Sequence, residues 1–149
     1  MQTFLPYSDF NKVASVLDMK RLNKQRVEAM QLINAITAIE NNDLYIIDKN
    51  GKRRKRGWLK HPATLMWFQY KEALKLYHNI MIKEWIRRGY KNNMKLFDIN
   101  SKKLKYPDWL GDEQIHASHR SNLLRKNKEY YSKFDWHEPD DMPYVWPVG

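Results

Sequence analysis

The sequence predicts a mainly α-helical protein: one compact domain over residues 1–149, with three to four helices, basic loops and an extended C-terminal tail. Three observations predict this class. Apolar residues recur at helical spacing in the long segments, suitable caps and stops bound these segments, and β-character is confined to one short stretch. A chain of 149 residues can also bury a core of its own.

The first two helices are expected in the N-terminal third of the chain. Ser8 is a suitable N-cap for a helix over 8–17. A second helix is expected over 20–40, where Leu22 and Ile33 belong to a stripe of apolar residues along one side.

A short β-hairpin is the next candidate element. Residues 45–47 have strand character, and Asn50-Gly51 is a typical hairpin turn. The second arm, 52–56, consists of five cationic residues and is too charged to pack in a core. We therefore expect either a basic loop or a marginal two-stranded ribbon.

The longest helix is expected to begin near Pro62, which suits a first turn, and to end before Gly89. Its apolar stripe follows a 4-3-4-3 spacing through Met66, Tyr70, Ala73, Tyr77 and Ile80. A lysine-containing loop follows, and a last helix is expected over 112–134. The remaining tail is rich in proline, aromatic and acidic residues, so we expect it to pack as an extended strap.

The charge balance favours a nucleic-acid partner. The net charge is +10, and the chain contains 6 Trp, 9 Tyr and 5 Phe. Excess positive charge attracts phosphate polymers, and aromatic side chains can stack on exposed bases as well as fill a core. The alternative is a lysine-rich surface that serves solubility alone.

The composition also excludes several classes. Without cysteine, the chain has no disulfide and no thiolate zinc site, which fits a reducing compartment. No apolar run approaches the length of about 18 residues that a membrane helix needs. The N-terminus has no signal-peptide pattern. We expect an intracellular, non-secreted monomer without membrane association, metal or cofactor.

One group of candidate site residues lies on the second helix. At 100° per residue, Arg21, Lys24 and Glu28 share the polar side and Gln25 lies at its edge. Arg26 falls among apolar residues, so it extends its charged end to the surface, pairs with a carboxylate such as one of the tail, or faces a cavity. Lys24 and Glu28 form either a surface pair or part of a site.

A second group lies on the last helix, where two histidines, an arginine, two serines and an asparagine fall within about two turns of helix. Such a face can donate hydrogen bonds to phosphates and hydroxyls, although a solvated helix with satisfied histidines explains it equally. The predicted nucleic-acid contacts here are His119, Arg120, Asn122, Arg125 and Lys126. His116 and His119 lack a third ligand at a spacing that would indicate a metal.

Two further candidates lie between these helices. His61 precedes a helix N-terminus, where it could help to receive an anion or simply cap the helix. The run 49–60 holds seven cations, among them Lys52, Arg53 and Arg54. Such a run predicts sequence-independent, salt-sensitive DNA binding, or alternatively a nuclear localisation signal.

Several segments in order resemble the pyrimidine-dimer DNA glycosylases of the endonuclease V type, most closely a poorly characterised branch of that superfamily. They cover over half the chain: MQTFLPYSDF, LDMKRLNKQRVEA, HPATLMWFQYKEALKLY, EWIRRG, SHRSNLLRK and PYVWP. The resemblance implies a compact domain of three main helices that binds and distorts damaged duplex DNA. It also implies cleavage of the glycosidic bond by an N-terminal α-amine, a Schiff base on C1′ and strand scission. An α-amine suits this role because its pKa is about 8.

The sequence departs from the family pattern at its N-terminus. The characterised enzymes expose a threonine after removal of the initiator methionine. Here Gln2 follows Met1, and its size disfavours removal, so the amine would belong to Met1 with Thr3 further in.

A second departure concerns the helix carboxylate. Asn23 aligns with the family's catalytic glutamate, whereas Arg26 matches a family arginine that contacts DNA. Glu28 is therefore our first choice for the acid–base group, with Lys24 or His61 as alternatives. Lys24 could also replace the amine as nucleophile, since a desolvated lysine loses its proton more readily.

These observations predict a DNA N-glycosylase, with or without lyase activity on abasic sites, acting on damaged or modified double-stranded DNA. We expect a flipped nucleotide near Arg26, His61 and His119, between the second and last helices. The main alternative is a DNA-binding module without catalysis on the same fold. A third is an enzyme that acts on free nucleotides or RNA.

Overall fold

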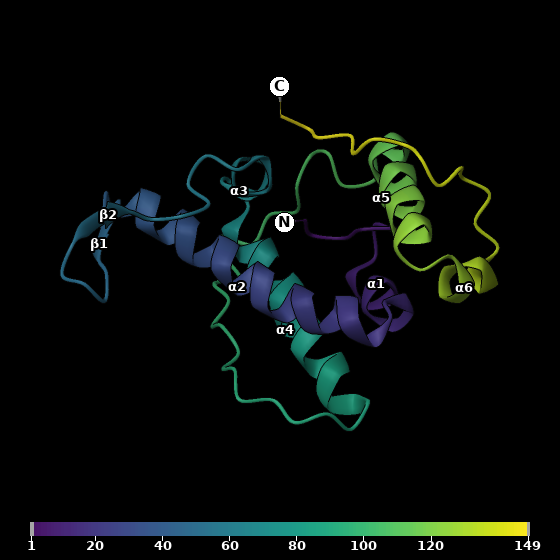
Figure 1. Ribbon diagram of the computed structural model, residues 1–149, viewed down its shortest axis with the longest axis horizontal. Coiled ribbons are helices and arrows are strands. Elements are labelled where there is room, and N and C mark those ends of the chain that lie inside the picture. Colours follow the sequence, from purple (N-terminus) through teal and green to yellow (C-terminus); the bar gives the residue numbers. More distant parts are fainter. Residues whose placement is uncertain (1, 149) are drawn as a thin grey trace.

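A computed structural model describes residues 2–148 and shows a mainly α-helical protein, as the sequence predicts (Figure 1). The described residues form more helices than the expected three to four. They are α1 (Phe10–Val16), α2 (Met19–Glu40), α3 (Pro62–Trp67), α4 (Lys71–Arg87), α5 (Glu113–Lys126), α6 (Lys128–Tyr131) and a 3₁₀ turn, η1 (Ser132–Phe134). Two strands, β1 (Tyr45–Ile47) and β2 (Arg53–Lys55), complete the order.

The core lies between α2 and α4, which cross each other at the centre of the molecule (Figure 1). The expected stripe of α2 is its buried face, since Leu22, Ala29, Ile33 and Ile36 are at most 1% exposed. Each fully buried Leu or Ile stabilises the fold by about 1.5–3 kcal/mol relative to an exposed one. The polar side of α2 is thereby fixed toward solvent and toward α5.

The first helix begins one residue later than predicted. Asp9, and not Ser8, is the N-cap of α1, because its Oδ1 accepts hydrogen bonds from the backbone N–H of Asn11 (2.9 Å) and Lys12 (3.2 Å). An aspartate satisfies two free N–H groups of the first turn here.

The expected single helix from Pro62 to Gly89 is wrong, because the chain leaves helical geometry between α3 and α4. Tyr70 has φ −129° and ψ 37°. Two aromatic side chains beside the interruption bind distant partners. Trp67 Nε1 donates to Thr3 Oγ1 (2.9 Å), and Tyr70 OH donates to Asp108 Oδ1 (2.6 Å). The sequence stripe continues through this break, so its spacing does not reveal it.

The expected helix over 112–134 is also interrupted. It begins close to the predicted start, with Asp112 as its N-cap, but α5 ends before Asn127, whose φ of −155° is not helical. The Asn127 side chain then caps the following short helix by accepting from Tyr130 N–H (3.2 Å). An asparagine favours this arrangement because its side chain competes for backbone hydrogen bonds.

The basic segment after α2 forms a two-stranded ribbon, one of the two structures that the sequence allowed. Strands β1 and β2 pair antiparallel, with Tyr45 opposite Lys55 and Ile47 opposite Arg53. Gly51 has a φ of +77°, which glycine adopts without steric cost. The hairpin extends from one end of α2, away from the core (Figure 1).

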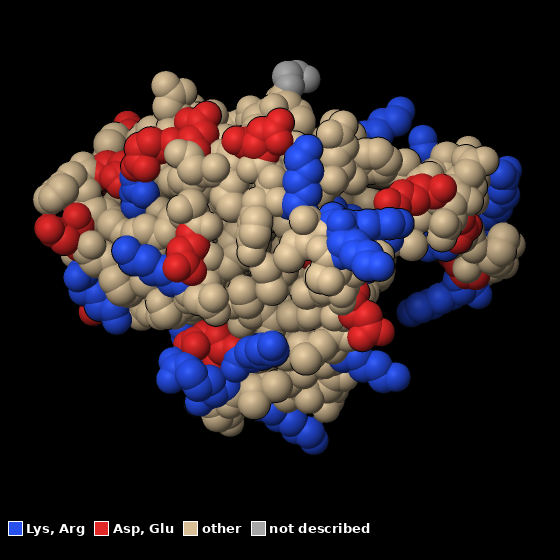
Figure 2. All heavy atoms as spheres, turned by 180° about the vertical axis from the view of Figure 1, so that it is seen from behind, with Lys and Arg blue, Asp and Glu red and all other residues tan. Residues whose placement is uncertain are grey.

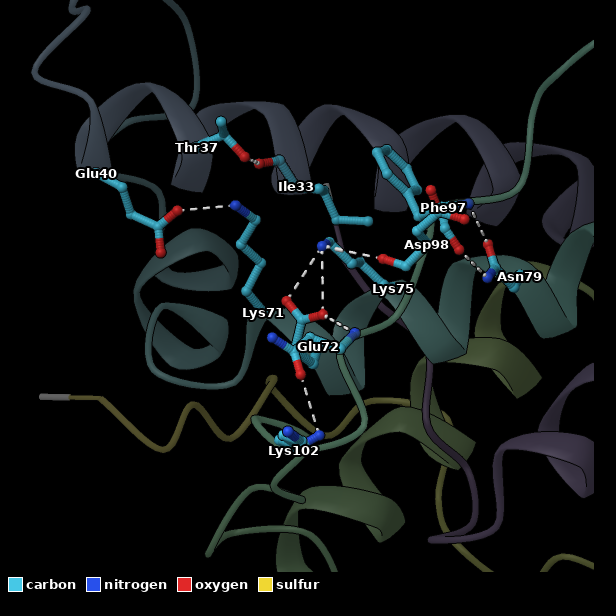
Figure 3. Close-up of polar contacts among 11 residues, drawn as sticks. Ile33, Thr37, Glu40, Lys71, Glu72, Lys75, Asn79, Phe97, Asp98 and Lys102 are labelled. Atoms are coloured by element: carbon cyan, nitrogen blue, oxygen red, sulfur yellow. Dashed lines mark hydrogen bonds and ion pairs between the residues drawn. The ribbon is translucent and has the colours of Figure 1, made fainter.

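The long segment between α4 and α5 is attached to α4 by polar side chains (Figure 3). Glu72 Oε1 accepts from Asn100 N–H (2.7 Å), and its other oxygen pairs with Lys75 (3.1 Å). Asn79 Oδ1 accepts from Phe97 N–H (2.9 Å). These bonds satisfy backbone groups that have no partner in a helix or sheet.

The C-terminal tail packs as an extended strap, as predicted, and runs along α5 (Figure 1). Buried polar side chains of α5 hold it. Ser121 Oγ accepts from Met142 N–H (3.0 Å), Ser118 Oγ accepts from Val145 N–H (3.2 Å), and Asn122 Nδ2 donates to the Met142 carbonyl (3.0 Å).

None of the helices within residues 2–148 combines the length and the apolar character needed to cross a membrane.

Candidate active site

An open cavity of about 290 Å³ lies where the first half of α2 meets the end of α5. The N-terminal segment and the tail complete its wall. It is lined by Gln2, Phe4, Arg21, Lys24, Gln25, Glu28, Lys126 and Tyr144. We call this cavity the α2–α5 pocket.

The α2 side chains reach the pocket because of their spacing. Arg21 is followed by Lys24, Gln25 and Glu28 at three, four and seven positions along the chain, which is the spacing of one helix face. Four of the predicted site residues thus meet in one place, and Lys126 joins them from α5. The cavity lies between α2 and α5, where the sequence analysis expects the flipped nucleotide, but its lining differs from the expected set.

Gln25 fixes the N-terminal segment against α2. Its Nε2 donates to the Gln2 carbonyl (2.9 Å), and its Oε1 accepts from Phe4 N–H (3.0 Å). The Tyr77 hydroxyl lies 2.7 Å from the same Oε1. Gln25 is only 1% exposed, so its amide is engaged inside the protein. We predicted Gln25 as a DNA contact, but its side chain holds the pocket wall.

The pocket is strongly cationic. Arg21, Lys24 and Lys126 face it, and Glu28 is the only carboxylate among its described lining residues. Desolvation lowers the pKa of the Lys126 ammonium, the charges of Arg21, Lys24 and Arg125 lower it further, and Glu28 opposes this shift. Such a cluster favours an anionic ligand such as a phosphate.

Glu28 lines the pocket beside Gln25. Its Oε2 lies 3.4 Å from Gln25 Nε2, the same group that binds the Gln2 carbonyl. The Glu28 carboxylate and the Gln2 carbonyl therefore contact the same side-chain amide, that of Gln25. Because Glu28 is partly exposed at the pocket, a ligand could reach it.

Two aromatic rings form the apolar part of the wall. Phe4 and Tyr144 come from opposite ends of the chain, with ring centroids 6.3 Å apart. A cavity that combines apolar walls with a few convergent polar groups is typical of a small-ligand or base site. Sequence reasoning did not assign Gln2, Phe4 or Tyr144 to the site, and only the tail segment PYVWP and the N-terminal segment hinted at them.

The predicted amine nucleophile, Met1, lies outside the described residues. Its neighbours Gln2 and Thr3 are buried, and Thr3 Oγ1 accepts from Trp67 Nε1 (2.9 Å). Thr3 is therefore part of the packed interior.

Arg26 points away from the pocket. Its guanidinium donates to Asn92 Oδ1 (2.6 Å) and Asn23 Oδ1 (2.7 Å), and it lies 4.6 Å from the Trp85 ring. The partners are amides and an aromatic ring, so Arg26 neither pairs with a carboxylate of the tail nor lines the α2–α5 pocket. Asn23, which accepts one of these hydrogen bonds, does not line the pocket either.

His61 caps a helix on another part of the surface. Its Nδ1 accepts from Ala63 N–H (3.0 Å), and its ring contacts Trp58 and Trp146. Burial lowers the pKa of His61, which keeps the ring neutral. The expected convergence of Arg26, His61 and His119 is therefore wrong, because α2, α3 and α5 direct the three side chains to different places.

The predicted DNA contacts of α5 are largely internal. His119 and Asn122 are fully buried. His119 Nδ1 accepts from Leu5 N–H (2.8 Å), and Asn122 binds the tail. Arg120 pairs with Glu113 and Glu138 and donates to the Pro6 carbonyl (2.7 Å). These side chains satisfy the extended N-terminal and C-terminal segments, which lack regular backbone partners.

Arg125 and Lys126 at the end of α5 are exposed, as are Lys52, Arg53 and Arg54 on the hairpin. The Arg53 guanidinium lies 3.9 Å from the Tyr45 ring. Within residues 2–148, no three His, Asp or Glu side chains gather so that they would hold a metal ion.

Comparison with known families agrees with the resemblance seen in the sequence. A family described as pyrimidine dimer DNA glycosylase matches residues 1–98, which include the whole of α2 and its pocket residues. No curated protein and no solved structure matched the chain in the corresponding searches. The matched part covers well over half of the 149 residues. The chain belongs to the pyrimidine dimer DNA glycosylase family.

Proposed function

We propose that this protein is a DNA N-glycosylase that removes a damaged or modified base, and that the α2–α5 pocket is its active site. The observation that carries the proposal is the meeting of Arg21, Lys24, Lys126 and Glu28 around a cavity bounded by the N-terminal segment. Family membership supplies the reaction class, and the pocket supplies the groups that such a reaction needs.

In this proposal the cations bind DNA phosphates, and the pocket receives an extrahelical base. Arg21, Lys24 and Lys126 hold the phosphates beside the flipped nucleotide. The base lies against Phe4 and Tyr144. Because the partner is DNA, we place the protein inside the cell.

The chemistry follows from an amine and a carboxylate. A neutral amine attacks C1′, the bond between C1′ and the base breaks, and the base leaves with a proton. Glu28 transfers protons between the amine, the sugar ring oxygen and the departing base. When the sugar ring opens, its oxygen takes a proton and the amine becomes an imine on C1′. Loss of a proton from C2′ then breaks the bond between C3′ and its oxygen, and the 3′ phosphate leaves. This elimination cuts the strand and is the lyase step.

Three amines can serve as the nucleophile: the Met1 α-amine, Lys24 and Lys126. Lys24 and Lys126 line the pocket. The lowered pKa of Lys126 favours its neutral form. Intact-mass measurement shows whether Met1 is retained, and peptide mapping of a trapped adduct identifies the amine that reacted.

The direct test is borohydride trapping on a panel of duplexes that carry single ultraviolet photoproducts or modified bases. We expect the wild-type protein to form a covalent adduct on at least one lesion, because borohydride reduces an imine to a stable amine. Glu28→Gln should lower the trapping rate by about 100-fold or more, as removal of a general acid–base group does.

Lys83→Ala is the matched control, since Lys83 is an exposed lysine on α4 and does not line the pocket. Its trapping rate should equal that of the wild type. Absence of both base release and adduct across the whole panel would refute the enzymatic proposal.

A DNA-binding module without catalysis is the second candidate, and one observation favours it. Asn23, which aligns with the family's catalytic glutamate, is an amide that binds Arg26. If this candidate is right, Glu28→Gln and Lys24→Ala bind duplex DNA as tightly as the wild type, and neither they nor the wild type release a base.

A further inference from the structure

Trp58 has an unusual backbone for a large aromatic residue. Its φ is +69°, in the left-handed region that bulky side chains rarely adopt. Glycine would accept this conformation without strain, yet Gly57, the preceding residue, does not carry the positive φ. The residue is 42% exposed, so burial does not explain why a tryptophan occupies this position.

The beginning of α3 holds Trp58 in place. The Trp58 carbonyl accepts hydrogen bonds from His61 N–H (3.3 Å) and from the Thr64 hydroxyl, and Thr64 is fully buried. A strained residue that its surroundings fix so firmly is a common feature of functional sites. The start of α3 therefore fixes the backbone that carries the exposed Trp58 side chain.

Aromatic rings extend from Trp58 toward the α2–α5 pocket. The ring centroids of Trp58 and His61 are 5.4 Å apart, those of His61 and Trp146 are 5.9 Å apart, and those of Trp146 and Tyr144 are 5.7 Å apart. Tyr144 also lines the pocket. A continuous row of rings thus links the pocket to Trp58.

Cations flank the outer end of this row. A depression of about 370 Å³ beside Trp58 is lined by Lys55, Arg56, Trp58, Leu59, Lys60 and His61. Its described lining contains no carboxylate, so it favours an anionic ligand. Arg56 is partly engaged by Asp43 (2.8 Å), which leaves Lys55 and Lys60 as the exposed cations at the rim.

We propose that Trp58, with His61 and Trp146, forms a second nucleic-acid site that stacks on an unpaired base of the DNA strand engaged by the α2–α5 pocket. The proposal rests on the DNA-binding part of the proposed function. Exposed aromatic rings beside cations are the usual design of single-strand binding sites, because every base has a face for stacking and every nucleotide a phosphate for pairing. Lys55 and Lys60 would hold the phosphates. The neutral form of His61 suits a stacking partner.

The test uses undamaged oligonucleotides, so that its result does not depend on catalysis. Binding of oligothymidylate is compared with binding of an abasic oligomer of the same length, which has the same phosphates but no bases. The main variant is Trp58→Gly, because glycine adopts the left-handed backbone without strain. We expect about a 10-fold or greater loss of oligothymidylate affinity. Affinity for the abasic oligomer and the salt dependence should stay unchanged.

Two further variants complete the design. Trp58→Phe keeps a stacking ring and should retain most of the affinity. Tyr90→Ala removes another exposed aromatic ring, one that stacks on Trp85 after α4, and should bind as the wild type does. Thermal melting confirms that each variant is folded.

Equal oligothymidylate affinity in the wild type and in folded Trp58→Gly overturns the proposal. An equal loss on the abasic oligomer also overturns it, since that loss would reflect phosphate binding alone. A failure of borohydride trapping, by contrast, would refute the proposed glycosylase and leave this binding result unaffected.

Discussion

Gln25 shows how one buried amide defines the candidate site. It is a polar residue 1% exposed on the inner edge of α2, and it binds the backbone of both Gln2 and Phe4. These backbone groups belong to an extended segment and have no partner in a helix or sheet. The part of the N-terminal segment that lines the pocket is therefore attached to α2 through this side chain.

Replacing Gln25 by alanine should lower the free energy of unfolding by about 2–4 kcal/mol, because at least two buried backbone groups lose their partner at about 1–3 kcal/mol each. Chemical denaturation measures this loss, and hydrogen exchange should show loss of protection at Phe4 N–H. Gln31→Ala, a half-buried glutamine on the same helix, is the control and should change stability by less than about 0.5 kcal/mol. Unchanged exchange at Phe4 would contradict the role given to Gln25.

At the scale of elements, the hairpin buries little of its surface. Strand β2 is exposed along its whole length, and all three of its residues are cationic. The pairing with β1 and the turn at Gly51 hold these charges away from the core (Figure 1). We therefore expect the hairpin to contribute to the affinity for DNA and not to the stability of the fold.

Neutralising Lys52, Arg53 and Arg54 to alanine should weaken DNA binding for all sequences alike. The slope of log affinity against log salt should flatten by about 0.9 for each phosphate that the variant no longer neutralises, so by about 2 or more in total. The melting temperature should stay near that of the wild type. The control replaces three exposed lysines of the segment after α4, namely Lys91, Lys102 and Lys103. If the slope of the hairpin variant is unchanged, the hairpin does not contact DNA.

At the scale of the whole molecule, buried polar side chains join the two ends of the chain to α5. His116 and His119 bind the carbonyl and the N–H of Leu5, while Ser118, Ser121 and Asn122 bind the tail. On the face drawn in Figure 2, acidic side chains gather along the upper edge, whereas basic side chains are spread over the rest of the face and the projecting hairpin. Positive charge is thus offered to a ligand over a broad part of this face.

The stability of this arrangement should depend on pH through His119. Burial, with a smaller effect of the neighbouring His116, lowers the pKa of His119 from 6.5 to about 3. The unfolded chain binds a proton below pH 6.5, whereas the folded protein does not until about pH 3. The contribution of neutral His119 to the free energy of unfolding is therefore complete above pH 6.5 and is lost as the pH falls toward 3.

Between pH 6.5 and 4.5, His119 should lower the free energy of unfolding by about 1.4 kcal/mol per pH unit. Denaturation curves of the wild type and of His119→Asn, taken across this range, isolate the effect. Asparagine keeps an acceptor for Leu5 N–H but does not titrate. The variant should be less stable at pH 7 and show a shallower pH dependence, and parallel curves would contradict the assignment.

The secondary structure was predictable where the local signal is strong. The apolar stripe of α2, the turn at Asn50-Gly51 and the start of the last helix near residue 112 each depend on residues close in sequence. The interruptions at Tyr70 and Asn127 were not predictable, because apolar spacing continues across the first and helix propensity across the second. Distant partners, such as Asp108 for Tyr70, fix the first break.

The amino-acid sequence alone determined the helical class, the positive charge and the family. It also determined that Arg21, Lys24 and Glu28 share one face of α2, the face that lines the pocket. These properties depend on composition and on the periodicity of neighbouring residues, which are local. Which polar residues are free to act depends instead on the three-dimensional arrangement. Arg26 is engaged by Asn92, and His119 and Asn122 are buried by the chain ends. The physical reason is that an extended backbone must find hydrogen-bond partners, and distant side chains supply them.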